Sequence, residues 1–268
     1  MSEAPRVVTS IEGSVAHVRL SRPEKRNGLD LAMFEGLIET GERIAADPSV
    51  RAVVLSGEGK AFCAGLDWMA FLGMGQEAGA KLLARDLSKS PANIAQRACW
   101  IWAEVPVPVI AAVHGAAMGG GLQLALACDL RIVAPDAQLS VMEVRYGLVP
   151  DMSASKTLLR LVRPDLAKEL VWTGRTVGAE EAVRIGLATR IESDHVGAAL
   201  ALARTIASQS PHAIRAGKRL CDESPELSVE DAFRLETELQ IPLLGSPNQM
   251  EAVQAAMGKR PATFSDPD

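Results

Sequence analysis

Three consecutive glycines, Gly119 to Gly121, join two apolar segments in the middle of the chain. Residues 107–113 are rich in valine, isoleucine and alanine, which is typical of a buried strand, and residues 122–128 predict a buried helix. Glycines let a ligand approach the main chain closely. The first N–H groups of a helix have no intrahelical partner and lie at its positive end. This segment therefore predicts a strand–turn–helix unit whose turn binds a phosphate or a transient oxyanion.

The pattern does not match the common phosphate-binding motifs. Neither Lys nor Ser/Thr follows the glycines, so a P-loop is excluded, and the glycine spacing does not fit G-x-G-x-x-G. The alternative to an anion-binding turn is a structural role, in which the small residues only allow a strand and a helix to pack closely. From the glycines alone, both interpretations stay open.

Composition places limits on the class of protein. Hydrophobic residues make up 48% and charged residues 23% of 268 residues, and the net charge of −5 comes from mixed acids and bases. This is typical of a globular protein and gives no nucleic-acid footprint. No Asp, Glu, Lys or Arg lies between Glu104 and Asp129, but the prolines, His114 and Gln123 favour a buried strand and helix over a membrane span. We expect no nucleic-acid partner and no membrane partner.

Cysteine and histidine usage favours a reducing compartment without a metal site. The four cysteines are scattered and include no C-x-x-C, and the four histidines show no ligand spacing. We expect reduced, mostly buried thiols, a cytoplasmic location and no bound metal.

Hydrophobic patterning predicts an α/β chain that becomes helical toward its end. Val7–Glu12 and Val15–Leu20 alternate around a Gly-Ser turn and predict a hairpin. Asp30 can cap a helix that ends near Ala46. Further strands are expected at residues 50–56, 130–134, 138–141 and 188–192. Helices are expected within residues 69–102 and at 193–209, 212–222, 229–239 and 247–257.

A second segment, residues 53–67, again places a β-branched strand before a glycine turn and a bend of small residues. Three further segments complete the pattern: Ser21-Arg22-Pro23-Glu24-Lys25-Arg26-Asn27-Gly28-Leu29, Glu143-x-x-x-Gly147-Leu148-Val149-Pro150 and Leu170-x-x-Thr173-Gly174-Arg175. In this order and spacing, they resemble the crotonase (enoyl-CoA hydratase/isomerase) superfamily over nearly the whole chain.

The resemblance implies an α/β fold, a crotonase-like ββα spiral core followed by a C-terminal helical trimerisation region. The core with its acyl-CoA site would span residues 1–195, and the helical oligomerisation region residues 196–268. It also implies a homotrimer or hexamer and an acyl-CoA substrate. Coenzyme A would be part of that substrate, so no separate cofactor is expected.

The resemblance places the two oxyanion-hole donors on the backbone N–H groups of Leu66 and Gly120. Removing a proton next to a thioester, or adding a nucleophile at C3, leaves negative charge on the thioester oxygen. Two N–H groups aimed at that oxygen would stabilise the charge. Because the donor is a backbone group, the identity of the Leu66 side chain matters little.

The family's hydratases use two glutamates, and these positions are Gln123 and Glu143 here. Gln123 has no titratable proton, although it can orient water or a polar group. Glu143 has apolar neighbours, which would raise its pKa toward the range useful for proton transfer. The alternative for Glu143 is a surface carboxylate paired with Arg145.

Asp151 follows the proline where many hydratases have glycine. A second acid eight residues after the glutamate resembles the dienoyl-CoA isomerase branch, although the third acid of that branch is replaced by Gln123. An N-cap of the next helix is an equally good interpretation of Asp151.

Two carboxylates without an acid at position 123 favour isomerisation of a double bond by Glu143 with Asp151. A hydratase that uses Glu143 and Gln123 stays open. An acyl-CoA thioesterase and a non-catalytic acyl-CoA-binding scaffold are further alternatives, whereas no Ser-His-Asp set supports a serine hydrolase.

Contacts with coenzyme A are expected from a further set implied by the resemblance: Lys25, Arg26, Lys60, Ala64, Asp67 and Gly119. The basic members would contact phosphates, and the main chain around Ala64 and Asp67 would lie near the adenine. For Trp68 and Trp172, a place in the core is favoured over a place in an acyl pocket.

Overall fold

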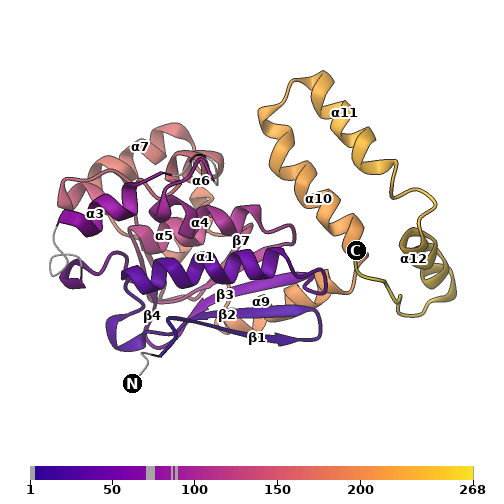
Figure 1. Cartoon of the computed structure of the whole chain (residues 1–268), viewed down its shortest axis with the longest axis horizontal. Helices are drawn as coiled ribbons and strands as arrows, with labels where there is room; N and C mark the ends of the chain where they lie inside the picture. Colours follow the sequence, from indigo (N-terminus) through magenta and orange to yellow (C-terminus); the bar gives the residue numbers. More distant parts are fainter. Residues whose placement is uncertain (1–3, 71–75, 86, 88–89, 268) are drawn as a thin grey trace.

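The computed structural model describes residues 4–70, 76–85, 87 and 90–267, which form two sheets, a layer of helices and a C-terminal helical arm (Figure 1). The larger sheet has the strand order β1 (Val7–Glu12), β2 (Val15–Leu20), β3 (Ala52–Gly57), β5 (Val109–Val113), β7 (Leu130–Val133) and β10 (Arg190–Ile191). Strands β1 and β2 are antiparallel around Gly13, so the predicted hairpin is confirmed. The other neighbours in this sheet are parallel.

Helices cover both faces of the larger sheet. Val53 and Leu55 pack in one apolar cluster with residues of α1 (Leu31–Ala45) and α4 (Ile94–Glu104). Val54 points to the opposite face, where it packs in a second cluster with α9 (His195–Ala207). Successive side chains of a strand alternate between faces. Burial on both faces explains why residues 52–55 of β3 are all apolar.

The N-terminus of α1 follows the sequence prediction. Oδ1 of Asp30 accepts a hydrogen bond of 2.8 Å from the backbone N–H of Met33.

The predicted helical region at residues 69–102 is divided into separate helices. Helix α3 (Gln76–Leu83) and α4 are separate, and Asn93 and Gln96 form a capping box at the start of α4. Parts of this region, residues 71–75, 86 and 88–89, lie outside the described residues.

The smaller sheet brings the two glycine bends to one edge. Its strands are β4 (Ala61–Cys63), β6 (Ala116–Met118), β8 (Gln138–Ser140) and β9 (Val177–Gly178), of which the first three are parallel. Strand β4 leads into Gly65 (φ +85°) and β6 into Gly119 (φ +52°). Because paired parallel strands end at the same edge, these two bends lie next to each other.

Helix α5 (Gly120–Leu126) starts directly after the second bend, and all of its residues are buried. A Cβ at Gly121 would lie 2.3 Å from the carbonyl oxygen of Cys63, so only glycine lets α5 pack this closely on β4. Close packing of a strand and a helix is thus one use of the glycine triplet, and binding at the turn stays a prediction. The charge-free segment is buried within the fold as β5 and α5, and none of the helices within the described ranges is long and apolar enough to cross a membrane.

Three helices and a one-turn segment follow β8: η2 (Glu143–Tyr146), α6 (Ala154–Leu161), α7 (Pro164–Thr173) and α8 (Ala179–Ile185). Another short helix, η1 (Pro23–Lys25), precedes α1. The predicted strands at residues 130–134, 138–141 and 188–192 are confirmed as β7, β8 and β10 with slightly different ends.

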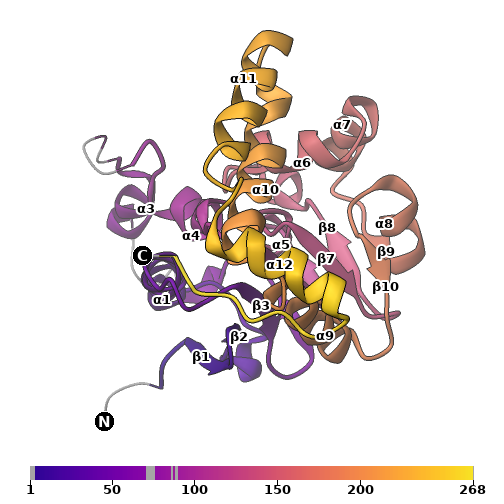
Figure 2. The ribbon, with the colours of Figure 1, turned by 90° about the vertical axis from the view of Figure 1, so that its right-hand side faces the viewer.

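The C-terminal arm consists of α10 (Pro211–Glu223), η3 (Ser224–Glu226), α11 (Val229–Gln240) and α12 (Pro247–Gly258), and it extends away from the sheets (Figures 1 and 2). Lys218 holds the arm to the body through an ion pair of 2.5 Å with Asp129. The predicted boundary between residues 195 and 196 falls at the start of α9, which packs on the sheet. The division into two domains stays a prediction.

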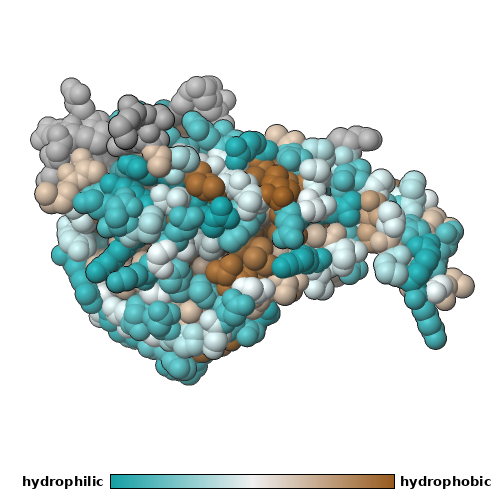
Figure 3. Space-filling model, turned by 90° about the horizontal axis from the view of Figure 1, so that it is seen from below, coloured by the Kyte–Doolittle hydropathy of each residue, from teal (hydrophilic) through white to brown (hydrophobic). Residues whose placement is uncertain are grey.

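Figure 3 shows one face of the molecule as mostly hydrophilic, with apolar patches near the junction between body and arm. All four cysteines are free, as expected, and three of them are buried, whereas Cys221 is exposed.

Replacing Gly121 tests the packing of α5 on β4. We expect Gly121→Ala to lower the free energy of unfolding by about 1–3 kcal/mol, because the added methyl group meets the backbone of Cys63. Gly217→Ala is the matched control, since a Cβ at this exposed position of α10 meets nothing within 4 Å. The control should raise stability by up to about 1 kcal/mol through helix propensity. Urea denaturation measures both, and equal stability of the two variants would contradict the packing argument.

Candidate active site

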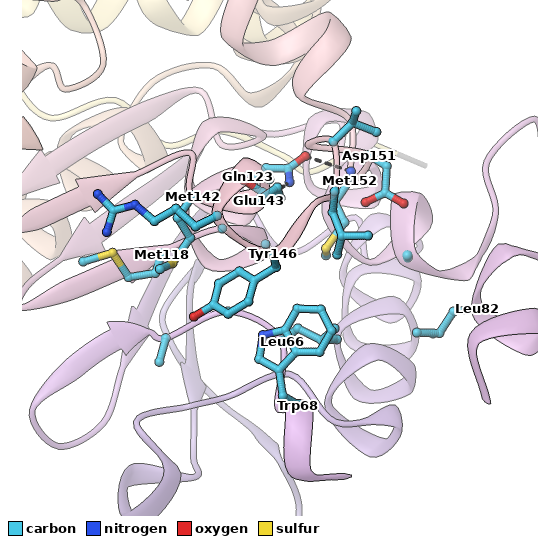
Figure 4. A pocket seen from close by; sticks show the side chains of 18 of the residues that line it. Leu66, Trp68, Leu82, Met118, Gln123, Met142, Glu143, Tyr146, Asp151 and Met152 are labelled. Carbon is cyan, nitrogen blue, oxygen red and sulfur yellow. Dashed lines mark hydrogen bonds between the residues drawn. The ribbon is translucent and has the colours of Figure 1, made fainter. Parts of the chain in front are cut away.

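The two glycine bends open onto a cavity of about 900 Å³. All five residues proposed from the sequence as catalytic groups or oxyanion donors line it: Leu66, Gly120, Gln123, Glu143 and Asp151 (Figure 4). Most of the other lining residues are apolar, among them Phe34, Leu82, Met118, Met142 and Met152. The fold thus gathers a few polar groups in apolar surroundings, which is typical of a small-molecule site.

The two bends are in direct contact. A Cβ at Gly65 would lie 2.6 Å from the carbonyl oxygen of Met118 and 3.7 Å from the backbone nitrogen of Gly120. The amides on either side of this bend are used in the fold: the carbonyl of Gly65 accepts from Leu29, and the N–H of Asp67 donates to Leu29. Within the described residues, the N–H of Leu66 between them has no protein acceptor.

Gly120 is the first residue of α5, so its N–H has no acceptor within the helix. Its neighbour Gly119 uses its own N–H in a bond of 2.9 Å to the carbonyl oxygen of Ser140. The N–H groups of Leu66 and Gly120 thus belong to adjacent bends that line the same cavity. This arrangement can stabilise a negatively charged oxygen.

Gln123 connects Glu143 to the start of α6. Its Nε2 donates a hydrogen bond of 2.6 Å to Oε1 of Glu143. Its Oε1 accepts from the backbone N–H groups of Met152, at 2.8 Å, and Ala154, at 3.3 Å. The residue is only 1% exposed. Most of the hydrogen-bonding capacity of this amide is therefore used inside the protein.

Burial raises the pKa of Glu143, and the nearby charge of Asp151 raises it further, while the hydrogen bond from Gln123 acts in the opposite direction. Its second carboxylate oxygen, Oε2, is buried and has no hydrogen-bond partner among the residues described. Over the described residues, the alternative ion pair between Glu143 and Arg145 is not formed: Oε1 accepts from Gln123, and Oε2 has no partner. A buried, partly unpaired carboxyl group of this kind binds a proton more readily than a carboxyl group in water does.

The interpretation of Asp151 as a helix N-cap is wrong. Helix α6 begins at Ala154, and Ser153 (φ +79°) occupies the N-cap position without a side-chain hydrogen bond. The backbone N–H groups of Met152 and Ala154, which follow Asp151, donate to Oε1 of Gln123 and not to the carboxylate of Asp151. The carboxylate of Asp151 lines the cavity, and partial burial raises its pKa.

The expected contacts with coenzyme A divide into two groups. Three residues line the cavity: Arg26, Ala64 and Gly119. Lys25 and Lys60 are exposed and lie outside its lining. The carboxylate of Asp67 forms an ion pair of 2.7 Å with Arg22, so its side chain has a structural partner. All six contacts stay predictions.

The expectation that Trp68 and Trp172 fill the core is wrong. Trp68 lines the cavity, and Trp172 is 70% exposed at the end of α7. Trp68 packs against Tyr146, with ring centroids 5.1 Å apart. Tyr146 was not singled out from the sequence, although it is the chain's one tyrosine and follows Glu143 by three residues.

A bound metal was not expected, and over the described ranges no group of three or more His, Cys, Asp or Glu side chains could hold one.

Comparison with known proteins identifies the family. The family profile described as enoyl-CoA hydratase/isomerase matches residues 10–267. The chain belongs to this family. The rat mitochondrial Delta(3,5)-Delta(2,4)-dienoyl-CoA isomerase is a relative, 34% identical over 279 residues that cover 96% of this chain and 82% of that protein. A Thermus thermophilus protein named as a candidate enoyl-CoA hydratase is 39% identical over 255 residues, with 94% of this chain and 98% of that protein covered.

Solved structures confirm the fold of this enoyl-CoA hydratase/isomerase family member. The crystal structure of an enoyl-CoA hydratase from Bacillus anthracis superposes with a TM-score of 0.89 at 30% identity, covering 97% of this chain and 98% of that one. The predicted crotonase-like α/β fold and the family resemblance are therefore confirmed.

The pH dependence of stability tests the burial of Glu143. Its pKa in the folded protein is raised above the ordinary value of 4.5, so the folded state binds this proton more tightly than the unfolded state. Stability from this group is therefore greatest below about pH 4.5 and falls as pH rises through the raised pKa. The neutral variant Glu143→Gln lacks this pH-dependent contribution to stability.

We expect the free energy of unfolding of the wild type, relative to Glu143→Gln, to fall with rising pH from about 4.5 and then to level off. Urea denaturation at several pH values measures the difference. For Glu12→Gln, a change at an exposed strand end, the difference from the wild type should show no such fall. A wild-type advantage that grows with pH would contradict the burial argument.

Proposed function

We propose that this protein isomerises a double bond in an unsaturated acyl-CoA, with Glu143 and Asp151 as the proton-transferring groups. The observation that carries the proposal is that two carboxyl groups with raised pKa line one apolar cavity, while Gln123 is occupied by protein contacts. The rat relative named as a dienoyl-CoA isomerase supports the same reaction class.

The N–H groups of Leu66 and Gly120 would form the oxyanion hole. Loss of a proton from C2 of the thioester gives an enolate, whose charge rests largely on the thioester oxygen. Two backbone donors in an apolar cavity can lower the energy of that state by several kcal/mol. We propose that the substrate's thioester lies over the contact between the two bends.

The two carboxyl groups would share the proton transfer. In a 3,5-dienoyl thioester, one of them takes a proton from C2, the electrons move along the conjugated chain, and the other gives a proton to C6. The product is the 2,4-dienoyl thioester, with no net gain or loss of atoms. Raised pKa values suit both tasks, because burial makes each carboxyl group hold a proton more readily than a carboxyl group in water does.

Hydration is the second candidate, and the state of Gln123 weighs against it. A hydratase that relies on Gln123 needs this amide to hold the attacking water. Its carbonyl oxygen already accepts two backbone N–H groups, and the side chain is 1% exposed. We infer that Gln123 orients Glu143 and the segment that follows Asp151, and does not bind water.

The substrate's coenzyme A moiety would extend from the bends toward the basic residues. Arg26, at the cavity wall, is the best placed cation for a phosphate, whereas Lys25 and Lys60 would reach it from the exposed surface. No separate cofactor is proposed, because coenzyme A arrives with the acyl group.

We also propose a homotrimer or a paired trimer assembled through the C-terminal arm. Helices α11 and α12 and the turn after α11 expose large apolar side chains, such as Phe233 at 62%, Ile241 at 65% and Met257 at 81%. Light scattering on the eluting protein measures the mass of the assembly. A cytoplasmic location stays a prediction.

Product analysis in deuterated water tests the reaction. We expect isomerised product with deuterium uptake from at least one of 2-enoyl-, 3-enoyl- and 3,5-dienoyl-CoA, measured by mass spectrometry. Rapid formation of 3-hydroxyacyl-CoA without movement of the double bond would establish the hydratase instead. Release of free coenzyme A would establish a thioesterase.

Two variants test the roles of the carboxyl groups. Glu143→Gln should lower kcat/KM by about 10²- to 10⁴-fold, as expected for loss of a general acid–base. Asp151→Asn should slow migration across dienes while sparing any hydration of 2-enoyl-CoA. Glu12→Gln, at an exposed residue outside the cavity lining, serves as the control. Unchanged turnover in Glu143→Gln, with acyl-CoA binding retained, would favour a non-catalytic scaffold.

A further inference from the structure

The bend that carries the Leu66 N–H is held by the loop that precedes α1. The backbone N–H of Leu29 donates to the carbonyl oxygen of Gly65 at 2.8 Å, and the N–H of Asp67 donates to the carbonyl oxygen of Leu29 at 3.0 Å. Leu29 and Leu66 thereby form an isolated parallel bridge. A Cβ at Gly120 would lie 2.9 Å from Cδ1 of Leu29, so Leu29 also packs against the second bend. The position of Leu66 relative to Gly120 therefore depends on where this loop lies.

A poorly exposed ion pair fixes the loop against the bend. Nη1 of Arg22 donates to Oδ2 of Asp67 at 2.7 Å and to the carbonyl oxygen of Gly28 at 3.0 Å. Nη2 of Arg22 lies 3.4 Å from Oδ2 of Asp30. The side chains of Arg22 and Asp67 are only 10% and 12% exposed. Oδ1 of Asp67 accepts from the N–H of Ala70 at 3.2 Å, so the same carboxylate also holds the chain after the bend.

This ion pair is charged, but it does not reach the cavity. Burial alone would raise the pKa of Asp67, but the hydrogen bonds from Arg22 and Ala70 outweigh burial, so the pKa lies below its ordinary value. Among the residues that the structure describes, the cavity lining includes neither Arg22 nor Asp67. Their side chains can therefore act on a ligand only through the backbone that they hold.

We propose that the ion pair between Arg22 and Asp67 positions the oxyanion hole, because it keeps the Leu66 N–H at the place where it can share one oxygen with the Gly120 N–H. This inference rests on the role proposed above for these two N–H groups. Donors that are already in place stabilise a developing charge without reorienting during the reaction. A shift of a reacting group by about 1 Å can cost about 100-fold in rate. Arg22 and Asp67 are thus positioning residues and not catalytic residues.

Infrared spectroscopy of a bound, unreactive thioester tests this role. Octanoyl-CoA labelled with carbon-13 at the thioester carbonyl has no double bond to move. Its carbonyl stretch falls to lower wavenumber when the oxygen accepts stronger hydrogen bonds. We expect the wild type to lower the stretch relative to the same ligand in water. Unfolded protein binds no ligand, so lost stability lowers the intensity of the bound band but does not move it.

Asp67→Ala and Arg22→Gln should each lose about half of this shift or more, because the charged hydrogen bonds that hold the bend are removed. Asp67→Asn should keep more of it than Asp67→Ala, since an amide oxygen can still accept from Arg22. Asp129→Ala is the matched control. Asp129 also accepts from a cation, Lys218, and from a backbone N–H, that of Val109, but neither Asp129 nor Lys218 is part of the cavity lining described. The control should leave the band where the wild type has it.

Kinetics separate positioning from binding. With an unsaturated acyl-CoA that the wild type converts, Asp67→Ala should lower kcat about 10- to 100-fold and change KM by less than about threefold. The reason is that the donors matter most once charge develops on the thioester oxygen.

A wild-type shift that both Asp67→Ala and Arg22→Gln preserve would overturn the positioning role and leave the oxyanion hole in place. So would an equal loss of the shift in Asp129→Ala, because the effect would then follow from stability alone. Absence of a shift in the wild type would refute the proposed oxyanion hole and this inference together. A shift that is lost in both variants of a protein that forms no isomerised product would support the positioning role and refute the proposed reaction alone.

Discussion

The parallel pairing of β4 with β6 is the contact on which the candidate site depends. It places the bend at Gly65 against the bend at Gly119, although 54 residues separate them in the chain. The distance between the two bends is set by backbone packing, since any Cβ at Gly65 would meet the carbonyl oxygen of Met118. Side chains around the cavity can therefore vary while the backbone N–H groups of Leu66 and Gly120 keep their places.

Gln123 connects the glycine bends to Glu143 and to the segment that follows Asp151. It lies on α5, which starts at the second bend, and its amide holds both the carboxylate of Glu143 and the turn after Asp151. A glutamate here would lack the N–H that Glu143 accepts and, if ionised, would repel it. With an amide at this position, the site has two titratable carboxyl groups in place of three, and the amide fixes the position of Glu143 and of the turn after Asp151.

The sequence predicted the features that depend on local chemistry. The hairpin followed from alternation, the cap of α1 from Asp30, and the strand–turn–helix unit from the glycines, because each is decided within a few residues. The predictions that failed concern packing between distant segments. Asp151 has the sequence context of an N-cap, but its helix starts later because Gln123, 28 residues earlier, accepts the N–H groups there. Trp68 was predicted to lie in the core, but it lines the cavity and contacts Tyr146, a residue distant in the sequence.

The same apolar surroundings that suit the proposed chemistry act against the stability of the folded chain. Burial raises the pKa of Glu143, and one of its oxygens has no partner among the residues that the structure describes, so the ionised group is less stable here than in water. Full pairing with an arginine would relieve this cost, but it would also lower the pKa and keep the carboxylate from accepting a proton. The hydrogen bond from Gln123 fixes the position of the Glu143 carboxylate through Oε1. It leaves Oε2 available for the proton.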